Sequence, residues 1–341
     1  IPSNAATLQV ETVTVVVSSQ PAAATVDEGQ TATFTTLGGV TMAPVGGNAA
    51  SSSFEVDQFD TPSGGGGNEE AQGQSSHTPN VTYQWEKSDD GGSSFNTVGG
   101  ATSASYTTGA LTYANDNLDQ YRCIISAVGA ASPATTIAGS VTVQRTFSIT
   151  SQPSNVTANE GATGTFAITT TSSSGTPTYQ WEKSDDGGAN YSTISGATSA
   201  SYTTSTLAYQ AFLVSSDDNA DRFRCVVSLV GSAADITSAH GELTVLRVIS
   251  IGTQPNSTAV TEGSTGTFNI VASITSDVLS YQWQISTNGG AAWSNINGAN
   301  SSTYTTPATT FPTTPSEQFR CVLTNTNATT VTSTAATLTV N

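Results

Sequence analysis

Clustered carboxylates are the first residues of this chain whose types and spacing could do chemistry. Asp116 and Asp119 form one cluster, and Asp217, Asp218 and Asp221 form a second one in a similar sequence context. Oxygen-rich loops of this kind bind Ca²⁺ in proteins. A third stretch with the same surrounding residues carries a single carboxylate, so a calcium site shared by all three is not expected. Solvated loop carboxylates are the simpler interpretation.

Histidine and cysteine offer little further chemistry. The two histidines, His77 and His240, are far apart and have no neighbouring cysteine or acidic cluster, which excludes a repeated zinc site or Ser-His-Asp triad. We therefore expect no enzyme, no cofactor and no metal. Three cysteines lie far apart at Cys123, Cys225 and Cys321. A small buried hydrophobe is the favoured interpretation of each, and a reactive or intermolecular thiol is the alternative.

These residues belong to a unit that is repeated three times. The copies begin at Gln20, Gln152 and Gln254, each followed by Pro, and they share further residues in the same order. A repeat of this length corresponds to one domain per copy. The shared residues that we expect to form the structural core are Trp85, Trp181 and Trp283, then Tyr106, Tyr202 and Tyr304, then Cys123, Cys225 and Cys321.

The elements that position these residues are short β-strands. Ser and Thr are abundant, apolar residues alternate with polar ones, and turn signals recur every 8–12 residues or so, which is typical of a β-sandwich. We expect an all-β chain with domains at 15–145, 146–247 and 248–341. Residues 1–14 are predicted to be the closing strand of an upstream domain plus a linker, because Thr7 to Val10 resembles the stretches Leu243 to Val245 and Leu338 to Val340. No initiator Met or signal peptide is visible, which favours a fragment or a matured product.

The copies resemble the immunoglobulin fold over nearly the whole chain. That family has Glu-Gly before the second strand, a core Trp on the third, and Tyr-x-Cys on the sixth. This chain has Glu28-Gly29, Trp85 and Tyr121-Arg122-Cys123, and equivalents in the other copies. The resemblance implies three tandem immunoglobulin-like sandwiches, which we expect to form an elongated rod. Immunoglobulin domains have a second cysteine that forms an inter-sheet disulfide with the one on the sixth strand. This chain has Thr36, Ile168 and Ile270 at that position, so no intra-domain disulfide is expected.

A ten-residue stretch that is identical in two repeats indicates which immunoglobulin-like modules the chain resembles most. Tyr-Gln-Trp-Glu-Lys-Ser-Asp-Asp-Gly-Gly occurs identically at 83–92 and 179–188. It is similar to immunoglobulin-like modules in virion proteins of tailed bacteriophages, marine cyanophages especially, and related modules occur on bacterial surface proteins. The resemblance implies a non-enzymatic structural or display component of a virion, such as a capsid or tail appendage, fibre or decoration, at the virion surface. A bacterial extracellular adhesin or filament subunit is the alternative, and an accessory region of a secreted enzyme is the third.

The turn after each core Trp resembles the Asp-box of sialidase propellers. It is Ser88-x-Asp90-x-Gly92-x-x-Phe95 in the first copy, and Trp293 takes the aromatic position in the third. In sialidases this box is a structural hairpin, and a well-made hairpin with an aromatic lid is the expected role here. If the chain binds host-surface glycans, Trp293 is a candidate aromatic platform.

The first copy carries 36 residues that the others lack, at about 38–78. Gly-rich stretches favour flexibility, but Phe54, Val56 and Phe59 alternate like a short strand. One hypothesis is that these three residues dock on a neighbouring virion or surface-assembly protein, or on a second copy. The alternative is a solvated loop, or one that folds back on its own domain.

Charge and hydropathy argue against nucleic-acid binding and membrane insertion. The chain has 8 Lys+Arg against 25 Asp+Glu, a formal net charge of −17. Nucleic acid is an unsuitable partner because phosphate contacts require a basic face. No apolar run reaches the roughly 20 residues of a membrane span, so no membrane insertion is expected. The sequence thus favours a module whose function lies in its contacts.

Overall fold

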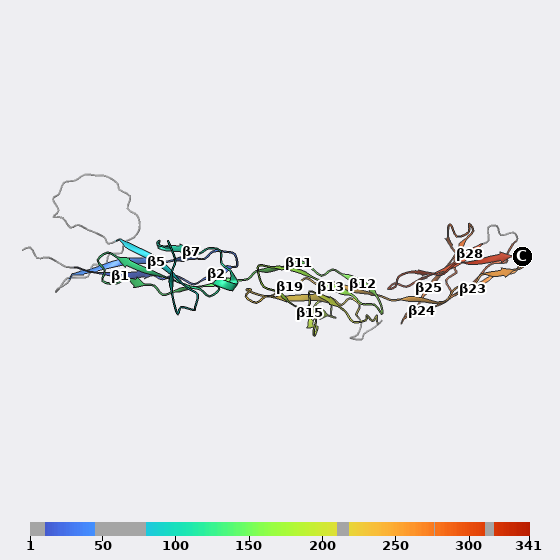
Figure 1. The fold of residues 1–341 in the computed structure, drawn as a ribbon. Coiled ribbons are helices and arrows are strands. Elements are labelled where there is room, and N and C mark those ends of the chain that lie inside the picture. Colours follow the sequence, from blue (N-terminus) through green and yellow to red (C-terminus); the bar gives the residue numbers. More distant parts are fainter. Residues whose placement is uncertain (1–10, 45–79, 210–217, 276, 311–316) are drawn as a thin grey trace, which may run out of the picture. The chain divides into compact units, whose positions relative to one another are not determined.

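The structure is a computed structural model that describes residues 11–44, 80–209, 218–275, 277–310 and 317–341 (Figure 1). The chain divides into two compact units. The first unit comprises Ile1–Phe147, Ser172–Pro177 and Leu229–Ala234, and the second comprises Ser148–Thr171, Thr178–Ser228 and Asp235–Asn341. Repeat 1 lies in the first unit. Repeat 3 and most of repeat 2 lie in the second.

In its described residues, repeat 1 has short strands and one helical turn. Its alternation of apolar and polar residues gives the strands one buried face, as in β8, where every second residue from Tyr121 to Ile125 is buried. The elements are β1 (Glu11–Ser19), β2 (Ala24–Asp27), β3 (Thr33–Thr35), β4 (Leu37–Pro44), β5 (Val81–Ser88), β6 (Asn96–Thr97), β7 (Ser105–Thr107), α1 (Tyr113–Asp116), β8 (Gln120–Ala127), β9 (Ala134–Thr135) and β10 (Gly139–Gln144).

Repeats 2 and 3 have the same strands in the same order. Repeat 2 has β11 (Phe147–Ser151), β12 (Val156–Asn159), β13 (Thr165–Ala167), β14 (Thr169–Ser172), β15 (Thr178–Ser184), β16 (Ser192–Thr193), β17 (Ser201–Thr203), β18 (Arg222–Ser228), β19 (Ile236–Thr237) and β20 (Gly241–Leu246). Repeat 3 has β21 (Ile249–Thr253), β22 (Thr258–Val260), β23 (Thr267–Asn269), β24 (Val271–Ile274), β25 (Ser280–Ser286), β26 (Ser294–Asn295), β27 (Thr303–Thr305), β28 (Gln318–Thr324), β29 (Val331–Thr332) and β30 (Ala336–Val340).

Strand pairing is identical in the three repeats and gives an immunoglobulin-like sandwich. In repeat 1 the larger sheet runs β2-β10-β8-β5-β6, with β9 also paired to β8, and the pairs β1-β4 and β3-β7 supply the opposite layer. β2 pairs with β10 in parallel, while the other pairs are antiparallel. In immunoglobulin terms β5, β8 and β10 are the third, sixth and seventh strands, which are neighbours in that fold. The predicted all-β class of three sandwiches is confirmed.

Aromatic residues fill the centre of each sandwich. The three core tryptophans, Trp85, Trp181 and Trp283, are fully buried, and each of their indoles donates from Nε1 to a backbone carbonyl 2.9 Å away, such as that of Ser103 for Trp85. A phenylalanine from the opposite layer stacks on the aromatic residue two positions before the cysteine, with ring centroids 4.7 Å apart for Phe34 and Tyr121. The same stack recurs in the other two repeats. Tyr106, Tyr202 and Tyr304 are half-buried at the edge of this cluster.

The three cysteines are free thiols with no exposed surface. Each lies directly across from the core Trp in the strand pairing, as Cys123 does from Trp85. At the positions where the immunoglobulin family has the partner of this cysteine, Thr36, Ile168 and Ile270 are buried. Ile168 and Ile270 fill this position with apolar side chains, whereas the hydroxyl of Thr36 donates to the Ser19 carbonyl.

Two boundaries drawn from the sequence are wrong. The first is the division between 14 and 15, which falls inside β1. Glu11–Ser19 pairs with β4 of the same repeat, so residues 11–14 belong to the first sandwich and not to an upstream domain. Thr7 to Val10 lie outside the described residues. The second is the start of the insertion: Gly38 to Val40 pair with β1 as Ala272 to Ile274 pair with β21, so the extra residues begin after Val40.

Candidate functional site

The turn after each core Trp is closed by its own side chains. Ser88 donates from Oγ to Asp90 Oδ1 at 2.7 Å, and Asp90 in turn accepts from the backbone and hydroxyl of Ser94. These hydrogen bonds, that of the Ser94 hydroxyl foremost, hold the pKa of Asp90 well below its usual range. Asp186 makes the corresponding bonds, with a pKa lowered to about 2, chiefly by the Asn190 backbone amide. A carboxylate held in this way stabilises the hairpin and is a poor general acid or base.

An arginine stacks on the aromatic residue of each turn. The guanidinium carbon of Arg122 lies 3.9 Å from the ring centroid of Phe95, and the corresponding distance is 3.8 Å for Arg224 over Tyr191 and 4.2 Å for Arg320 over Trp293. Arg122 and Arg224 also bind a glutamate on the neighbouring strand, whereas Arg320 binds a glutamine. Trp293 is therefore half-buried, with Arg320 over one ring face and its Nε1 donating to the Gly290 carbonyl.

The carboxylate clusters bind lysine. In repeat 1 the ammonium of Lys87 lies 2.5 Å from Asp119 and 3.2 Å from Asp116. In repeat 2 Lys183 lies 2.5 Å from Asp221 and 3.5 Å from Asp218. Among the residues that the structure describes, no group of three His, Cys, Asp or Glu side chains could hold a metal ion.

Burial and charge act in opposition at these pairs. Burial alone would lower the pKa of Lys183, but the hydrogen bond to Asp221 and the charges of Asp221 and Asp218 outweigh it and raise that pKa. Burial raises the pKa of Asp221 to about 6 although Lys183 opposes the shift. The aspartate side chain is 2% exposed and the lysine 32%, so each pair is a bridge from the core to the surface.

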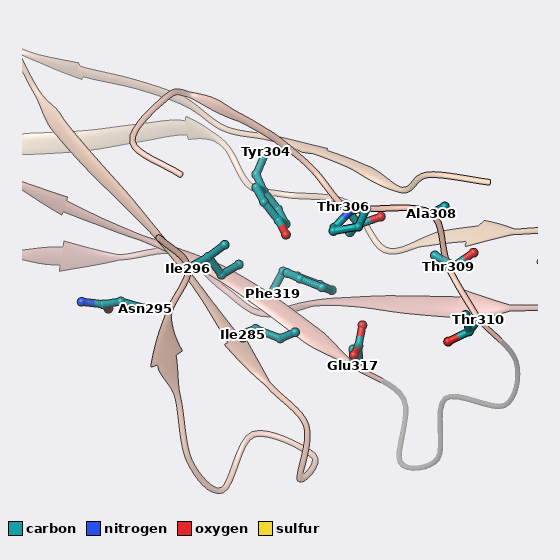
Figure 2. A pocket seen from close by; sticks show the side chains of 11 residues that line it. Ile285, Asn295, Ile296, Tyr304, Thr306, Ala308, Thr309, Thr310, Glu317 and Phe319 are labelled. Atoms are coloured by element: carbon teal, nitrogen blue, oxygen red, sulfur yellow. The ribbon is translucent and has the colours of Figure 1, made fainter. Parts of the chain in front are cut away.

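Repeat 3 has a pocket at the place of these lysine pairs. Its volume is about 370 Å³, and Figure 2 shows Tyr304 on one side and Glu317 on the other, with Phe319 between them and Ile285 and Ile296 beside it. Within the strand pairing Ile285 lies across from Phe319, as Lys183 lies across from Phe223. The full lining is Ile285, Asn295, Ile296, Tyr304, Thr306, Pro307, Ala308, Thr309, Thr310, Glu317 and Phe319.

Within the first unit, Glu28 and Arg145 bind the loop Ser172–Pro177. Glu28 accepts hydrogen bonds from the hydroxyls of Ser173 and Ser174, and these lower its pKa. Arg145 stacks on the ring of Tyr113 at 4.1 Å and donates to Ser174. Its backbone forms an isolated parallel bridge with Ser232.

Within the second unit, Arg247 takes the corresponding place. It is 2% exposed, stacks on Tyr209 at 4.2 Å and forms an ion pair with Asp277. Its backbone forms the same type of isolated parallel bridge with Ala328. In repeat 1 the corresponding bridge joins Val13 and Ala130. These arginines were not singled out from the sequence. They could have been found there, because Val13, Arg145 and Arg247 each stand seven residues before the Gln of their copy.

Of the residues predicted to bind a partner, the structure describes Trp293. Phe54, Val56 and Phe59 lie outside the described residues, and Trp293 is on the turn of repeat 3. The pocket of repeat 3 was missed. The signal was present in the sequence, because Ile285 stands two residues after its Trp, where the other copies have Lys87 and Lys183.

A family model described as a domain of unknown function, DUF8696, matches residues 64–145, 148–247 and 239–341. The chain belongs to the DUF8696 family. Three copies of the domain correspond to the three repeats seen in the sequence and in the strand pairing. No curated protein matches the chain in sequence.

Solved structures of immunoglobulin domains are similar to the DUF8696 chain at low identity. Sidekick-1 immunoglobulin domains 1–5 share 15% identity at a TM-score of 0.38, over 98% of this chain and 60% of that one. The titin I-band fragment I67–I69 shares 11% at a TM-score of 0.39, over 98% and 100%. Drosophila OTK extracellular domains 3–5 share 12% at 0.36, over 96% and 97%. The fold assignment rests on the strand pairing described above. Among the described residues, no helix is long and apolar enough to cross a membrane.

Proposed function

We propose that this DUF8696 chain is a non-enzymatic structural and display component of a phage virion, an appendage, fibre or decoration on capsid or tail. The observation that carries the proposal is the repetition of one sandwich in which, among the described residues, the turn carboxylates, the lysine-binding aspartates and the thiols have partners or packing within their own repeat. Asp90 and Asp186 hold turns, Asp119 and Asp221 hold lysines, and the thiols are in the core. A repeated domain of this kind provides spacing and surface without chemistry of its own.

The phage assignment rests on the residue pattern that the repeats share with phage virion modules, and the alternative is a bacterial extracellular adhesin or filament subunit. These two functions predict different locations for the protein, in the virion or in the bacterial envelope. Quantitative mass spectrometry on gradient-purified virions and on the bacterial envelope is expected to find the chain at a fixed ratio to the major capsid protein. Recovery with the envelope in uninfected cells would favour the adhesin and refute the virion assignment.

Partners of the proposed display role are other virion or surface-assembly proteins, a second copy, or host-surface glycans. The first two are tested by deleting 45–79 and comparing incorporation into particles; docking through Phe54, Val56 and Phe59 requires incorporation to fall. The glycan role is tested on a glycan array with the wild type and Trp293→Ala. Binding that survives the substitution removes Trp293 as the platform. The elongated rod expected from the sequence stays a prediction.

A further inference from the structure

The pocket of repeat 3 occupies a site that the other two repeats fill with their own lysine. Backbone hydrogen bonds establish the equivalence without reference to side chains. Glu317 accepts through its carbonyl from Leu338 N, as Asp221 accepts from Leu243 N and Asp119 from Val141 N. Repeat 3 therefore keeps a carboxylate at the acceptor position and has Ile285 where the lysine donor stands elsewhere.

A second replacement widens the same site. The position of Thr309 is occupied by Leu111 in repeat 1 and Leu207 in repeat 2, as its backbone bonds to Gly263 N and Ser264 O indicate. Both leucines are 3% exposed. Loss of a leucine and of a lysine stem leaves a pocket of about 370 Å³, which is within the range of about 300–1,000 Å³ typical of ligand sites.

The pocket places an apolar wall beside a carboxylate. Ile285, Ile296 and Phe319 line its interior, and Tyr304 and Glu317 lie on opposite sides (Figure 2). Burial, with the charge of Glu317, raises the pKa of Tyr304, so its hydroxyl stays protonated and able to donate or accept. An aliphatic chain that ends in a cation matches this arrangement, because it packs its methylenes on the apolar wall and brings its charge to the carboxylate.

The chain itself has no spare cation of this kind. Each of its eight Lys and Arg side chains is already bound within a repeat or unit, by ion pairs or by hydrogen bonds and ring stacking: Lys87, Arg122, Arg145, Lys183, Arg222, Arg224, Arg247 and Arg320. A second copy would have to break one of these interactions to fill the pocket. A separate basic protein does not, and the net charge of −17 attracts it.

We propose that the pocket of repeat 3 is a socket for a lysine side chain of a different protein, with the ammonium bound by Glu317 and the stem packed on Ile285 and Ile296. The proposal goes beyond the proposed function, because it rests on repeat 3 alone and holds for a virion and a cell surface alike.

The test titrates the full chain with two capped tripeptides, Gly-Lys-Gly and Gly-norleucine-Gly, followed by NMR of the Ile285 and Ile296 methyl groups. The lysine peptide is expected to shift both methyls saturably, and the norleucine peptide, with the same stem length and no charge, is expected to bind at least about tenfold more weakly. Equal shifts with both peptides, or none with either, would overturn the proposal. n-Butylamine is the third probe, and binding of the free amine without binding of the peptide would also overturn a protein source.

Three variants assign the binding to the socket. Glu317→Gln is expected to weaken lysine-peptide binding by at least about tenfold, whereas Asp235→Asn, which removes one exposed negative charge from repeat 2, is expected to leave it within about twofold. Ile285→Lys restores the internal donor, so it should abolish peptide binding and raise the melting temperature. Unchanged binding in Glu317→Gln or in a folded Ile285→Lys would contradict the assignment.

Discussion

The buried thiols differ chemically from surface cysteines. Burial raises the pKa of Cys225 and of Cys321 to about 11 and also raises that of Cys123. The thiolate is the reactive form, and it is scarce at neutral pH under these conditions. A lone cysteine in each repeat is therefore a packing residue in the folded chain and becomes reactive when the sandwich opens.

Alkylation measures this directly. At pH 8 the native chain is expected to take up no iodoacetamide over the time in which the urea-unfolded chain takes up three equivalents, as counted by intact mass. Cys225→Ala should reduce the unfolded count to two and leave the native count unchanged. Labelling of native Cys225 at the rate of free cysteine would contradict the prediction.

The turn carboxylates give a pH dependence with a defined sign. The pKa of Asp186 is lowered from 3.8 to about 2 by hydrogen bonds from Asn190 and Ser184. A lowered folded-state pKa stabilises the fold above the unfolded value, and this stability is lost as the pH falls from about 4 through about 2. The third repeat has Asn288 in the same bonds, so its turn has no such dependence.

NMR can separate the two turns in one sample. The amide of Asn190 donates to Asp186 Oδ1, and its chemical shift is expected to titrate with a midpoint near 2. The amide of Ala292, which donates to Asn288, should not titrate in that range. Asp186→Asn should abolish the inflection at Asn190. A midpoint at 3.8 or above would show that the turn does not stabilise the carboxylate.

At the scale of elements, the first strand of each later repeat is anchored by the arginine that precedes it. Arg247 is buried on Tyr209 and paired with Asp277, and its amide donates to the carbonyl of Asn327. Arg247→Ala is expected to lower the stability of the second unit by about 1–3 kcal/mol through lost packing and charge contact. Urea unfolding followed by tryptophan fluorescence measures the loss.

The matched control is Arg247→Lys, which keeps the charge and loses the planar stack and forked donors. It should fall between wild type and the alanine variant. Repeat 1 has Val13 at the corresponding position, so Val13→Ala is a second control that should cost less than Arg247→Ala. A loss in Arg247→Ala no larger than that in Val13→Ala would mean that the ring stack and the ion pair of the arginine contribute no stability of their own.

The spacing of residues in the sequence was sufficient to predict the core of each sandwich, but not where individual strands begin and end. The Trp, Phe and Cys positions place one aromatic stack in each sandwich because their side chains must share one buried face. The insertion was placed at about 38–78 and Gly-rich stretches within it favoured flexibility, yet its first residues, Gly38 to Pro44, pair with the valine-rich β1. Tertiary pairing overrode local propensity there.

The pocket shows a different limit of the sequence. Ile285 and Thr309 are ordinary residues for a strand and a loop, and neither suggests a site by type. Their meaning appears only when repeat 3 is compared with repeats whose structure shows Lys183 bound to Asp221. The pocket exists because repeat 3 lacks the lysine and the leucine that fill this position in repeats 1 and 2, so it can be recognised only after the contacts of those residues are known.

At the scale of the whole molecule, negative charge is the property that the repeats share. The chain has 25 acidic residues, and its eight basic ones are already engaged in contacts of their own. The uncompensated carboxylates repel one another in the folded state more than in the expanded unfolded chain. Salt screens this repulsion, because the Debye length falls from about 30 Å at 0.01 M to about 3 Å at 1 M.

The melting temperature is therefore expected to rise between about 0.01 M and 0.5 M NaCl at pH 7, as followed by circular dichroism. Salt also weakens exposed ion pairs such as Arg222 with Glu242, but these are few and contribute about 0–1 kcal/mol each. At about pH 4 many carboxylates are protonated, so the same salt step should raise the melting temperature by less. A fall with salt at pH 7 would mean that local pairs outweigh the repulsion across the chain.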